Sequence, residues 1–220
     1  MKTKVLTFGN LQKNVSFLKN FLFKHGLIFG RTQSGKTTFV FNTLKHIPLP
    51  KNHFILFFNT QFDKRFNIFK TVTKVPEIPN AFLKSKIVNY FPKSFVDPED
   101  ELSEIIKLSF RLSKYVNLTF ILDEVQAFST KFKIPFWLKM IVTRGLGHGI
   151  NFIGITQRLQ NINHNFMTQS FWFILFPLNR FDYPYLNYYG IPIPNWKIHK
   201  KGYSKNCFFY NWFELWEIML

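Results

Sequence analysis

The sequence predicts an α/β fold in which a mainly parallel sheet carries helices on both faces. Short apolar segments such as 54–58 and 150–155 have the length and composition of buried parallel strands. Segments with the spacing of amphipathic helices, such as 98–115, alternate with them along the chain. A glycine-rich turn at 30–37 joins the apolar segment 26–29 to a predicted helix. In folds of this kind the functional residues follow the carboxyl ends of the strands.

The turn has the sequence GRTQSGKT, which matches the phosphate-binding pattern G-x-x-x-x-G-K-[ST] at every fixed position. The glycines let the backbone curl, so that successive N–H groups face phosphate oxygens. Lys36 can reach the β- and γ-phosphates, the Thr37 hydroxyl can hold Mg²⁺, and helix 37–46 adds the positive end of its dipole. The sequence therefore predicts a site for ATP and Mg²⁺, with these nucleotide-binding residues: Gly30, Arg31, Thr32, Gln33, Ser34, Gly35, Lys36, Thr37 and Thr38.

The next predicted elements are strands at 54–58 and 87–91 and then a helix. Asp97 is the expected N-cap of that helix and Pro98 its first residue, followed by an acidic first turn that suits the helix dipole. We interpret this acidic turn as a helix start and not as a metal site.

The predicted strand 118–122 runs directly into Asp123 and Glu124. An apolar strand that ends in paired acids is the Walker B pattern. Asp123 would then hold the Mg²⁺ shell through water, and Glu124 would orient and polarise the attacking water. The pairing divides metal binding and water activation between two groups.

Residues 144–149 contain G-x-G, but they follow a predicted helix at 134–143 and precede the strand 150–155. That order is wrong for a dinucleotide site, so the glycines are expected to end the helix. The strand leads into Thr156-Gln157-Arg158, beside the Walker B strand. Gln157 is therefore the candidate sensor of the γ-phosphate. The alternative is a strand-end amide that is satisfied by a loop.

The rest of the chain is predicted to surround this core. We expect a short helix capped by Asn163, a strand at 171–176, a helix that opens at Arg180, and a terminal strand and short helix in 207–220. Residues 2–8 resemble a strand, and 15–23 either a strand or a helix. These N-terminal segments would form an edge addition to the sheet or an arm that contacts a neighbouring subunit.

We predict a single domain over 1–220, with a core of about 24–190 and peripheral extensions at 1–23 and 191–220. Cys207 is the only cysteine, so no intrachain disulfide is possible. The sequence shows neither a secretory leader nor an apolar run long enough to span a bilayer, and we expect an intracellular protein without a transmembrane segment. The 30 Phe residues are attributed to codon bias in a genome rich in A and T.

The chain is strongly basic, with 29 Lys and Arg against 12 Asp and Glu, a net charge of +17. Such a charge favours a polyanionic partner, first nucleic acid and second an anionic membrane surface; the alternative is a merely basic protein. Residues 63–86 interleave Lys and Arg with Phe. Two interpretations of this segment stand: a nucleic-acid surface, or a solvated face over a local hydrophobic cluster.

The order of these motifs resembles that of the additional-strand, RecA-like branch of P-loop ATPases. Within that branch, RGLGHGINFIGITQR is similar to the FtsK–HerA superfamily of DNA-pumping motors. The short layout most resembles the genome-packaging ATPases of double-jelly-roll viruses, including archaeal icosahedral viruses. The resemblance covers about residues 24–190.

The resemblance implies a homo-oligomeric ring, pentameric or hexameric, with ATP sites at subunit interfaces. Its partners would be double-stranded DNA, bound without sequence specificity, and a capsid or portal-vertex protein, in the host cytoplasm or at the virion vertex. Matching positions carry the catalytic roles to Lys36, Glu124 and Gln157, and the metal roles to Thr37 and Asp123. Arg144 matches a basic position that could serve as the trans-acting arginine finger, Arg180 is the competing candidate, and Arg158 belongs to the T-Q-R motif.

Three other functions are less consistent with the sequence. A phage-extrusion or conjugation ATPase would typically carry a membrane anchor. A nucleotide-gated nucleic-acid-binding switch would need no dedicated base. The paired acids Asp123 and Glu124, together with Gln157, argue against it. A small-molecule kinase would explain neither the +17 charge nor the T-Q-R segment.

Overall fold

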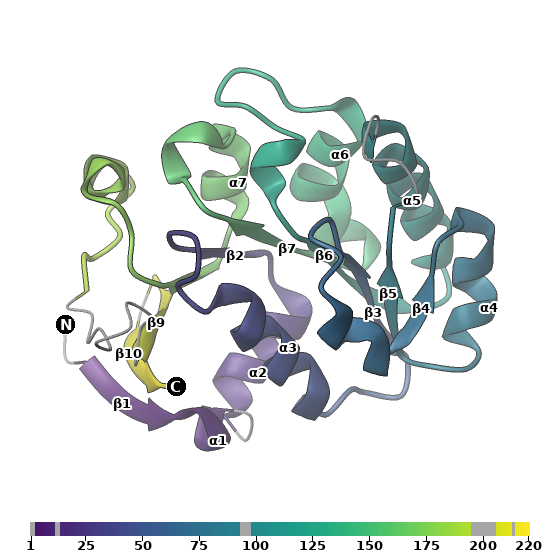
Figure 1. The fold of residues 1–220 in the computed structure, drawn as a ribbon, viewed down its shortest axis with the longest axis horizontal. Helices are drawn as coiled ribbons and strands as arrows, with labels where there is room; N and C mark the ends of the chain where they lie inside the picture. Colours follow the sequence, from purple (N-terminus) through teal and green to yellow (C-terminus); the bar gives the residue numbers. More distant parts are fainter. Residues whose placement is uncertain (1–2, 12–13, 93–97, 195–205, 213) are drawn as a thin grey trace.

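The centre of the molecule is a ten-stranded sheet, seen in a computed structural model that describes residues 3–11, 14–92, 98–194, 206–212 and 214–220 (Figure 1). The strands are β1 (Thr3–Thr7), β2 (Gly26–Phe29), β3 (His53–Phe58), β4 (Lys70–Val72), β5 (Ile87–Tyr90), β6 (Asn117–Leu122), β7 (Ile150–Thr156), β8 (Trp172–Leu175), β9 (Asn206–Asn211) and β10 (Glu214–Met219). Their order across the sheet is β1-β10-β9-β8-β2-β7-β6-β3-β5-β4.

The strands from β8 to β4 in this order all run parallel to one another. Strand β9 is antiparallel to both β8 and β10, and β1 pairs in parallel with β10. The carboxyl ends of these parallel strands therefore meet at one edge of the sheet, which we call the carboxyl edge. It includes the ends of β2, β3, β6, β7 and β8.

Helices cover both faces of this sheet (Figure 1). The helices are α1 (Phe8–Leu11), α2 (Val15–Phe23), α3 (Lys36–His46), α4 (Ile78–Phe82), α5 (Pro98–Leu112), α6 (Phe136–Arg144), α7 (His164–Gln169) and α8 (Tyr183–Tyr188). Helices α2 and α3 pack in one hydrophobic core together with Ile28 of β2. Helices α5, α6 and α7 pack in a second core with Leu27 and Phe29. Alternate residues of one strand thus face opposite cores, and the predicted α/β fold is confirmed.

The arrangement β2-β7-β6 places one strand between the P-loop strand and the Walker B strand. Residue Ile28 of β2 lies opposite Ile155 of β7, and Ile121 of β6 lies opposite Ile153. This inserted strand is the one that leads into the T-Q-R segment. The additional-strand topology expected from the motifs is therefore present.

The two ends of the chain extend the same sheet. Residues 15–23 form a helix, α2, because the Asn14 side chain caps it by accepting from the Phe17 N–H. Strand β1 is an edge addition beside β10, which is one of the two alternatives expected for the N-terminal segment. The prediction of a short C-terminal helix was wrong.

The C-terminal segment is instead a hairpin of β9 and β10. Asn211 Oδ1 accepts a hydrogen bond from the Glu214 N–H at 2.8 Å and so links the end of β9 to the start of β10. In β10, Trp216 and Ile218 face one core, while Leu215 faces the other. This alternation of faces is that of a strand, and it suits the outer part of the sheet.

Residues 63–86 contain two elements that the sequence prediction missed, β4 and α4. The Phe66 side chain is fully buried, and Phe69 and Phe82 pack against the two cores. Four lysines of the segment, Lys64, Lys70, Lys74 and Lys84, are exposed. The structure therefore favours the solvated face over a local hydrophobic cluster, since these rings point inward and are not available for stacking with bases.

Helix α5 begins at Pro98, as predicted, with its acidic first turn. The expected N-cap at Asp97 and the basic segment 195–205 lie outside the described residues. In the part of the chain that the structure describes, no helix combines the length and the apolar character needed to cross a membrane.

Candidate active site

The predicted site lies at the carboxyl edge, where the loops after β2, β6 and β7 come together. Two backbone hydrogen bonds hold the P-loop there. Gly30 N–H donates to Thr156 O at the end of β7 (3.3 Å), and Arg31 N–H donates to Pro177 O beyond β8 (2.8 Å). The strands on either side of β2 therefore position the loop.

Glycine is required at both fixed positions of the loop. A Cβ atom on Gly30 would lie 2.4 Å from the Phe176 Cβ and 2.9 Å from the Ser34 Oγ. Gly35 has a φ of 105°, in the left-handed region that other residues rarely adopt. The loop is thus a tight cradle that a side chain would fill, which is the shape that phosphate binding by backbone N–H groups needs.

Lys36 lies inside this cradle, with only 7% of its surface exposed. Its Nζ donates to Gly30 O (2.7 Å) and Arg31 O (2.9 Å), so the ammonium is held over the loop. Burial lowers the pKa of Lys36 to about 8, against the opposing attraction of the Asp123 and Glu124 carboxylates. A partly desolvated ammonium in this position is suited to pair with phosphate oxygens. Thr37, the next residue, is half-buried in the first turn of α3.

Asp123 follows β6 and is 2% exposed. Its Oδ1 accepts from the Glu124 N–H at 3.0 Å, whereas its buried Oδ2 has no hydrogen-bond partner among the described residues. Burial raises the pKa of Asp123 to about 7, and the neighbouring Glu124 carboxylate adds to this, while Lys36 opposes it. A buried carboxylate oxygen without a partner is what a cation ligand requires, so the residues present fit Mg²⁺.

A chain of side-chain hydrogen bonds connects the three motifs. The Thr32 hydroxyl of the P-loop donates to Gln157 Oε1 at 2.6 Å. Gln157 Nε2 in turn donates to Glu124 Oε1, also at 2.6 Å. The backbone at Glu124 is left-handed, with a φ of 54°, an uncommon conformation for a glutamate. Gln157 thus lies between the phosphate loop and the paired acids, where a sensor would have to be.

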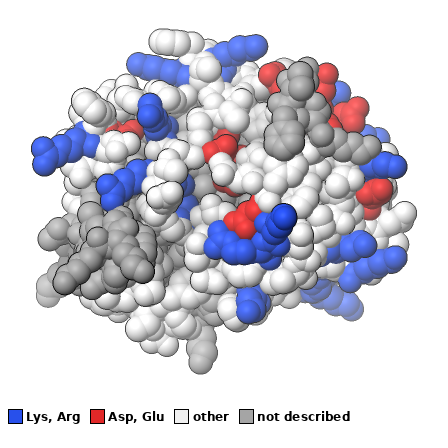
Figure 2. Space-filling view, in the orientation of Figure 1, with Lys and Arg blue, Asp and Glu red and all other residues white. Residues whose placement is uncertain are grey.

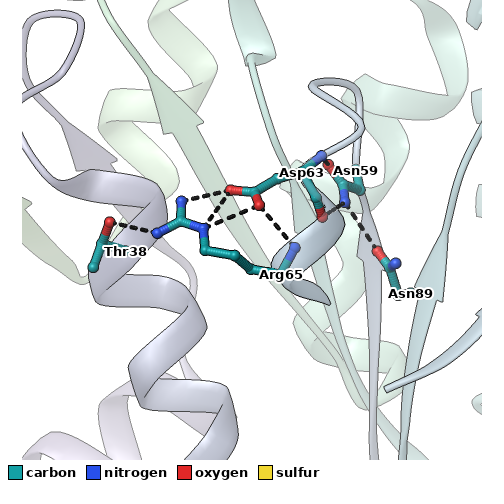
Figure 3. A network of polar contacts seen from close by, with 5 residues as sticks. All are labelled: Thr38, Asn59, Asp63, Arg65 and Asn89. Atoms are coloured by element: carbon teal, nitrogen blue, oxygen red, sulfur yellow. Dashed lines mark hydrogen bonds and ion pairs between the residues drawn. The ribbon is translucent and has the colours of Figure 1, made fainter. Parts of the chain in front are cut away.

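The structure adds Arg65, which the sequence analysis had placed only within the basic segment 63–86 (Figure 3). Its guanidinium binds the Asp63 carboxylate at 2.5 Å and donates to the Thr38 hydroxyl of α3 at 2.9 Å. These hydrogen bonds hold the pKa of Asp63 below its usual value, although partial burial opposes them. Arg65 thereby ties the loop after β3 to the first turn of α3. No sequence signal could have found this contact, because the two residues are 27 positions apart and belong to different motifs.

Further polar contacts hold this loop. Asn59 Oδ1 accepts from the Asp63 N–H at 3.2 Å, and Asn59 Nδ2 donates to Asn89 Oδ1 at 3.3 Å (Figure 3). Thr60, the next residue, donates from its hydroxyl to Asp123 O at 3.3 Å. The end of β3 is therefore bonded both to the Walker B acid and to β5.

The candidate finger arginines lie at different edges of the sheet. Arg144 ends α6 just before β7 begins, which places it at the amino ends of the strands, away from the P-loop. Arg180 lies beyond the end of β8 and lines a surface hollow with Arg158 and Asn179 at the carboxyl edge. Both Arg144 and Arg180 are exposed. The fold thus brings together Thr32, Lys36, Asp123, Glu124 and Gln157, but not Arg144.

Sequence comparison gives no relative. Neither the protein-family models nor the curated proteins yield a match.

Structure comparison does find similar proteins. The genome-packaging NTPase B204 from Sulfolobus turreted icosahedral virus 2, in complex with ATP-gammaS, is 16% identical with a TM-score of 0.66, over 86% of this chain and 92% of that one. The same NTPase in complex with sulfate is 15% identical with a TM-score of 0.68, over 90% of this chain and 98% of that one. EssC (ATPases 2 and 3) from Geobacillus thermodenitrificans is 14% identical with a TM-score of 0.56, over 89% of this chain and 38% of that chain. The chain therefore has the fold of these ATPases, and the resemblance indicated by its motifs is confirmed at the level of the fold.

Proposed function

We propose that this protein is an ATPase that couples ATP hydrolysis to the movement of double-stranded DNA, in the packaging of a viral genome into a preformed capsid. The observation that carries the proposal is the chain of hydrogen bonds from Thr32 through Gln157 to Glu124. It connects a phosphate loop to a candidate base through a single amide. An arrangement that only binds nucleotide has no need of this connection.

The bound substrate would be Mg²⁺-ATP. The P-loop N–H groups and Lys36 would hold its β- and γ-phosphates, and the Thr37 hydroxyl and Asp123 would hold the cation, the latter through water. The cation, when bound, supplies charge neutralisation at the phosphates. The tight glycine cradle and the unpartnered Asp123 Oδ2 support this assignment.

Glu124 would orient the attacking water and accept its proton. In the structure its Oε1 is held by the Gln157 amide at 2.6 Å, so the base and the sensor are coupled before the substrate arrives. A γ-phosphate near Thr32 would accept a hydrogen bond from the second N–H of this amide, since a primary amide offers two N–H groups and one oxygen. Gln157 would then report the presence of the phosphate to Glu124. An arginine from a neighbouring subunit, Arg144 or Arg180, would complete the site in a pentameric or hexameric ring.

The proposed partners are double-stranded DNA and a capsid or portal-vertex protein, in the host cytoplasm or at the virion vertex. The net charge of +17 supports binding to the DNA backbone without sequence preference. Lys and Arg side chains are distributed around the face seen in Figure 2 rather than gathered in one patch. The similarity of the fold to a genome-packaging NTPase supports the packaging role.

The test of this function is the variant Glu124→Gln. It keeps the size of the side chain and one oxygen that can accept from Gln157 but removes the base, so ATP should bind with near-normal affinity while steady-state hydrolysis falls about 100-fold or more. Hydrolysis would be measured with and without double-stranded DNA, at low and moderate salt, with Lys36→Ala as the blank.

The matched control is Glu99→Gln, an exposed glutamate in the first turn of α5, which should hydrolyse ATP like the unmodified chain. Normal turnover in Glu124→Gln would remove Glu124 from the mechanism. Turnover that does not respond to DNA would argue against translocation. ATP-dependent DNA binding without any turnover would favour the nucleotide-gated switch.

A further inference from the structure

A second concave surface lies on the carboxyl edge, between the loop 129–135, α7 and α8. It encloses about 440 Å³ and is called the aromatic groove. Its lining includes Lys131, Phe132, His164, Tyr185, Tyr188 and Tyr189. The segments that form it follow β6, β7 and β8, so the groove exists only in the folded chain.

Two of the aromatic rings in the groove are exposed to solvent. Phe132 is 90% exposed and Tyr188 is 77% exposed. The Lys131 Nζ lies 5.6 Å from the centre of the Phe132 ring and 6.0 Å from that of Tyr185. His164 Nδ1 and the Tyr189 hydroxyl are hydrogen-bonded at 2.9 Å, which joins the start of α7 to the end of α8. The Lys131 ammonium thus lies among the aromatic rings of one concavity.

The loop that carries Lys131 is tied to the rest of the groove. Asn163 Nδ2 donates to Lys131 O at 3.2 Å, and the Asn163 Oδ1 caps α7. The loop also closes on itself, since the Thr130 N–H donates to Lys133 O at 2.8 Å. The exposed lysine and phenylalanine are therefore presented by a defined turn.

The chain around the groove carries almost no negative charge. Between Glu124 and Glu214 the sequence has one acidic residue, Asp182. Its side chain is 1% exposed, and its Oδ1 accepts from the Leu159 N–H at 3.0 Å. Lys131 and Lys133, in contrast, are both exposed. The groove is thus complementary to a polyanion.

We infer that the aromatic groove binds an unpaired segment of a nucleic acid strand. The rings of Phe132 and Tyr188 would stack on bases, and Lys131 and Lys133 would pair with phosphates. In a duplex each base face is covered by its neighbours, so exposed rings in a concave surface have no base face to contact. An unpaired base has a free π-face that any such ring can use. This binding goes beyond the proposed handling of duplex DNA, and it does not depend on ATP hydrolysis.

The experiment uses the full chain without nucleotide and measures fluorescence anisotropy of labelled DNA. The probes are an oligothymidine strand of about 20 nucleotides, an abasic strand of equal length and a hairpin duplex. Oligothymidine should bind more tightly than the abasic strand. Tyr188→Ala should weaken its binding roughly tenfold, while Tyr188→Phe, which keeps the ring, should bind like the unmodified chain. Lys131→Gln should reduce the salt dependence of binding.

The matched control is the pair Lys114 and Tyr115, an exposed cation beside an 83% exposed ring at the amino ends of the strands. Tyr115→Ala should leave binding unchanged. Thermal melting followed by circular dichroism would verify that each variant is folded. Equal binding of the abasic and thymidine strands would overturn the inference. So would an equal loss in Tyr115→Ala and Tyr188→Ala, or an unchanged affinity in Tyr188→Ala.

Discussion

The Gln157 side chain occupies the point at which the P-loop and the paired acids meet. It accepts from Thr32 on one side and donates to Glu124 on the other. Both contacts are short, and both use the same planar amide, so a shift of one partner moves the other. The sequence indicated Gln157 from its place at the end of a strand. The role of Thr32, at a variable position of the P-loop pattern, comes from the structure alone.

The variant Thr32→Val tests this connection because it replaces the hydroxyl with a methyl group of similar size. It should lower kcat roughly three- to tenfold, as expected for one hydrogen bond between neutral groups, with little change in ATP affinity. Steady-state hydrolysis and equilibrium nucleotide binding would be measured together. Thr32→Ser restores the hydroxyl and should recover most of the activity. A Thr32→Val protein with unchanged kcat would separate Thr32 from catalysis.

At the scale of secondary structure, the C-terminal hairpin is part of the core rather than an appendage. The Phe209 ring of β9 is fully buried and lies 5.6 Å from the Phe17 ring of α2, 6.1 Å from the Trp172 ring of β8 and 5.7 Å from the Trp216 ring of β10. One side chain therefore joins the N-terminal helix, the parallel part of the sheet and the hairpin. Some of the many aromatic residues of the sequence therefore serve to pack these elements against one another.

Phe209→Ala should therefore lower the free energy of unfolding by about 3–5 kcal/mol, because it leaves a large cavity between rigid elements. Urea denaturation followed by circular dichroism measures this change. Phe181→Ala is the matched control, since Phe181 is 80% exposed and its removal should change the free energy of unfolding by less than about 0.5 kcal/mol. If Phe209→Ala lowered the free energy of unfolding as little as Phe181→Ala does, the hairpin would not contribute to the core.

At the scale of the whole molecule, two buried histidines couple stability to pH. His25 accepts a hydrogen bond on Nδ1 from the Phe152 N–H of β7 at 2.8 Å, so it is neutral in the folded state. His53 Nε2 is hydrogen-bonded to the Thr119 hydroxyl of β6 at 2.8 Å. Burial lowers the pKa of both histidines to about 4. The unfolded chain, where a histidine has its ordinary pKa of about 6.5, therefore binds protons that the folded chain does not.

The folded state should consequently lose stability as the pH falls from about 6.5 toward 4, and keep it above that range. The part of this loss in unfolding free energy that comes from His25 approaches about 3 kcal/mol near pH 4, because its pKa differs by about 2.5 between the folded and unfolded states. Urea denaturation at pH 7 and pH 5 measures it. His25→Asn, whose side-chain oxygen can accept the same hydrogen bond, should reduce the pH dependence to the share that His53 contributes, whereas His148→Asn, at an exposed position, should leave it unchanged. An equal pH dependence in all three proteins would contradict this assignment.

The sequence by itself determined the features that depend on local chemistry. The glycine spacing and Lys36 predicted the phosphate cradle, the apolar runs predicted the parallel strands, and Asp123 and Glu124 were expected at the end of β6. These signals are readable because a strand, a tight turn and a helix start each impose requirements on a few adjacent residues. The α/β class and the inserted strand followed from their order.

Only the tertiary structure decided the contacts between distant segments. It paired β1 with β10, turned the expected C-terminal helix into a hairpin and brought Arg65 onto α3. It also turned the Phe rings of 63–86 inward, and gathered the exposed rings of the aromatic groove from loops that follow three strands. Such contacts depend on which strands become neighbours and on which face of the sheet each side chain lies. Burial of the whole chain decides both, and no short stretch of sequence records the outcome.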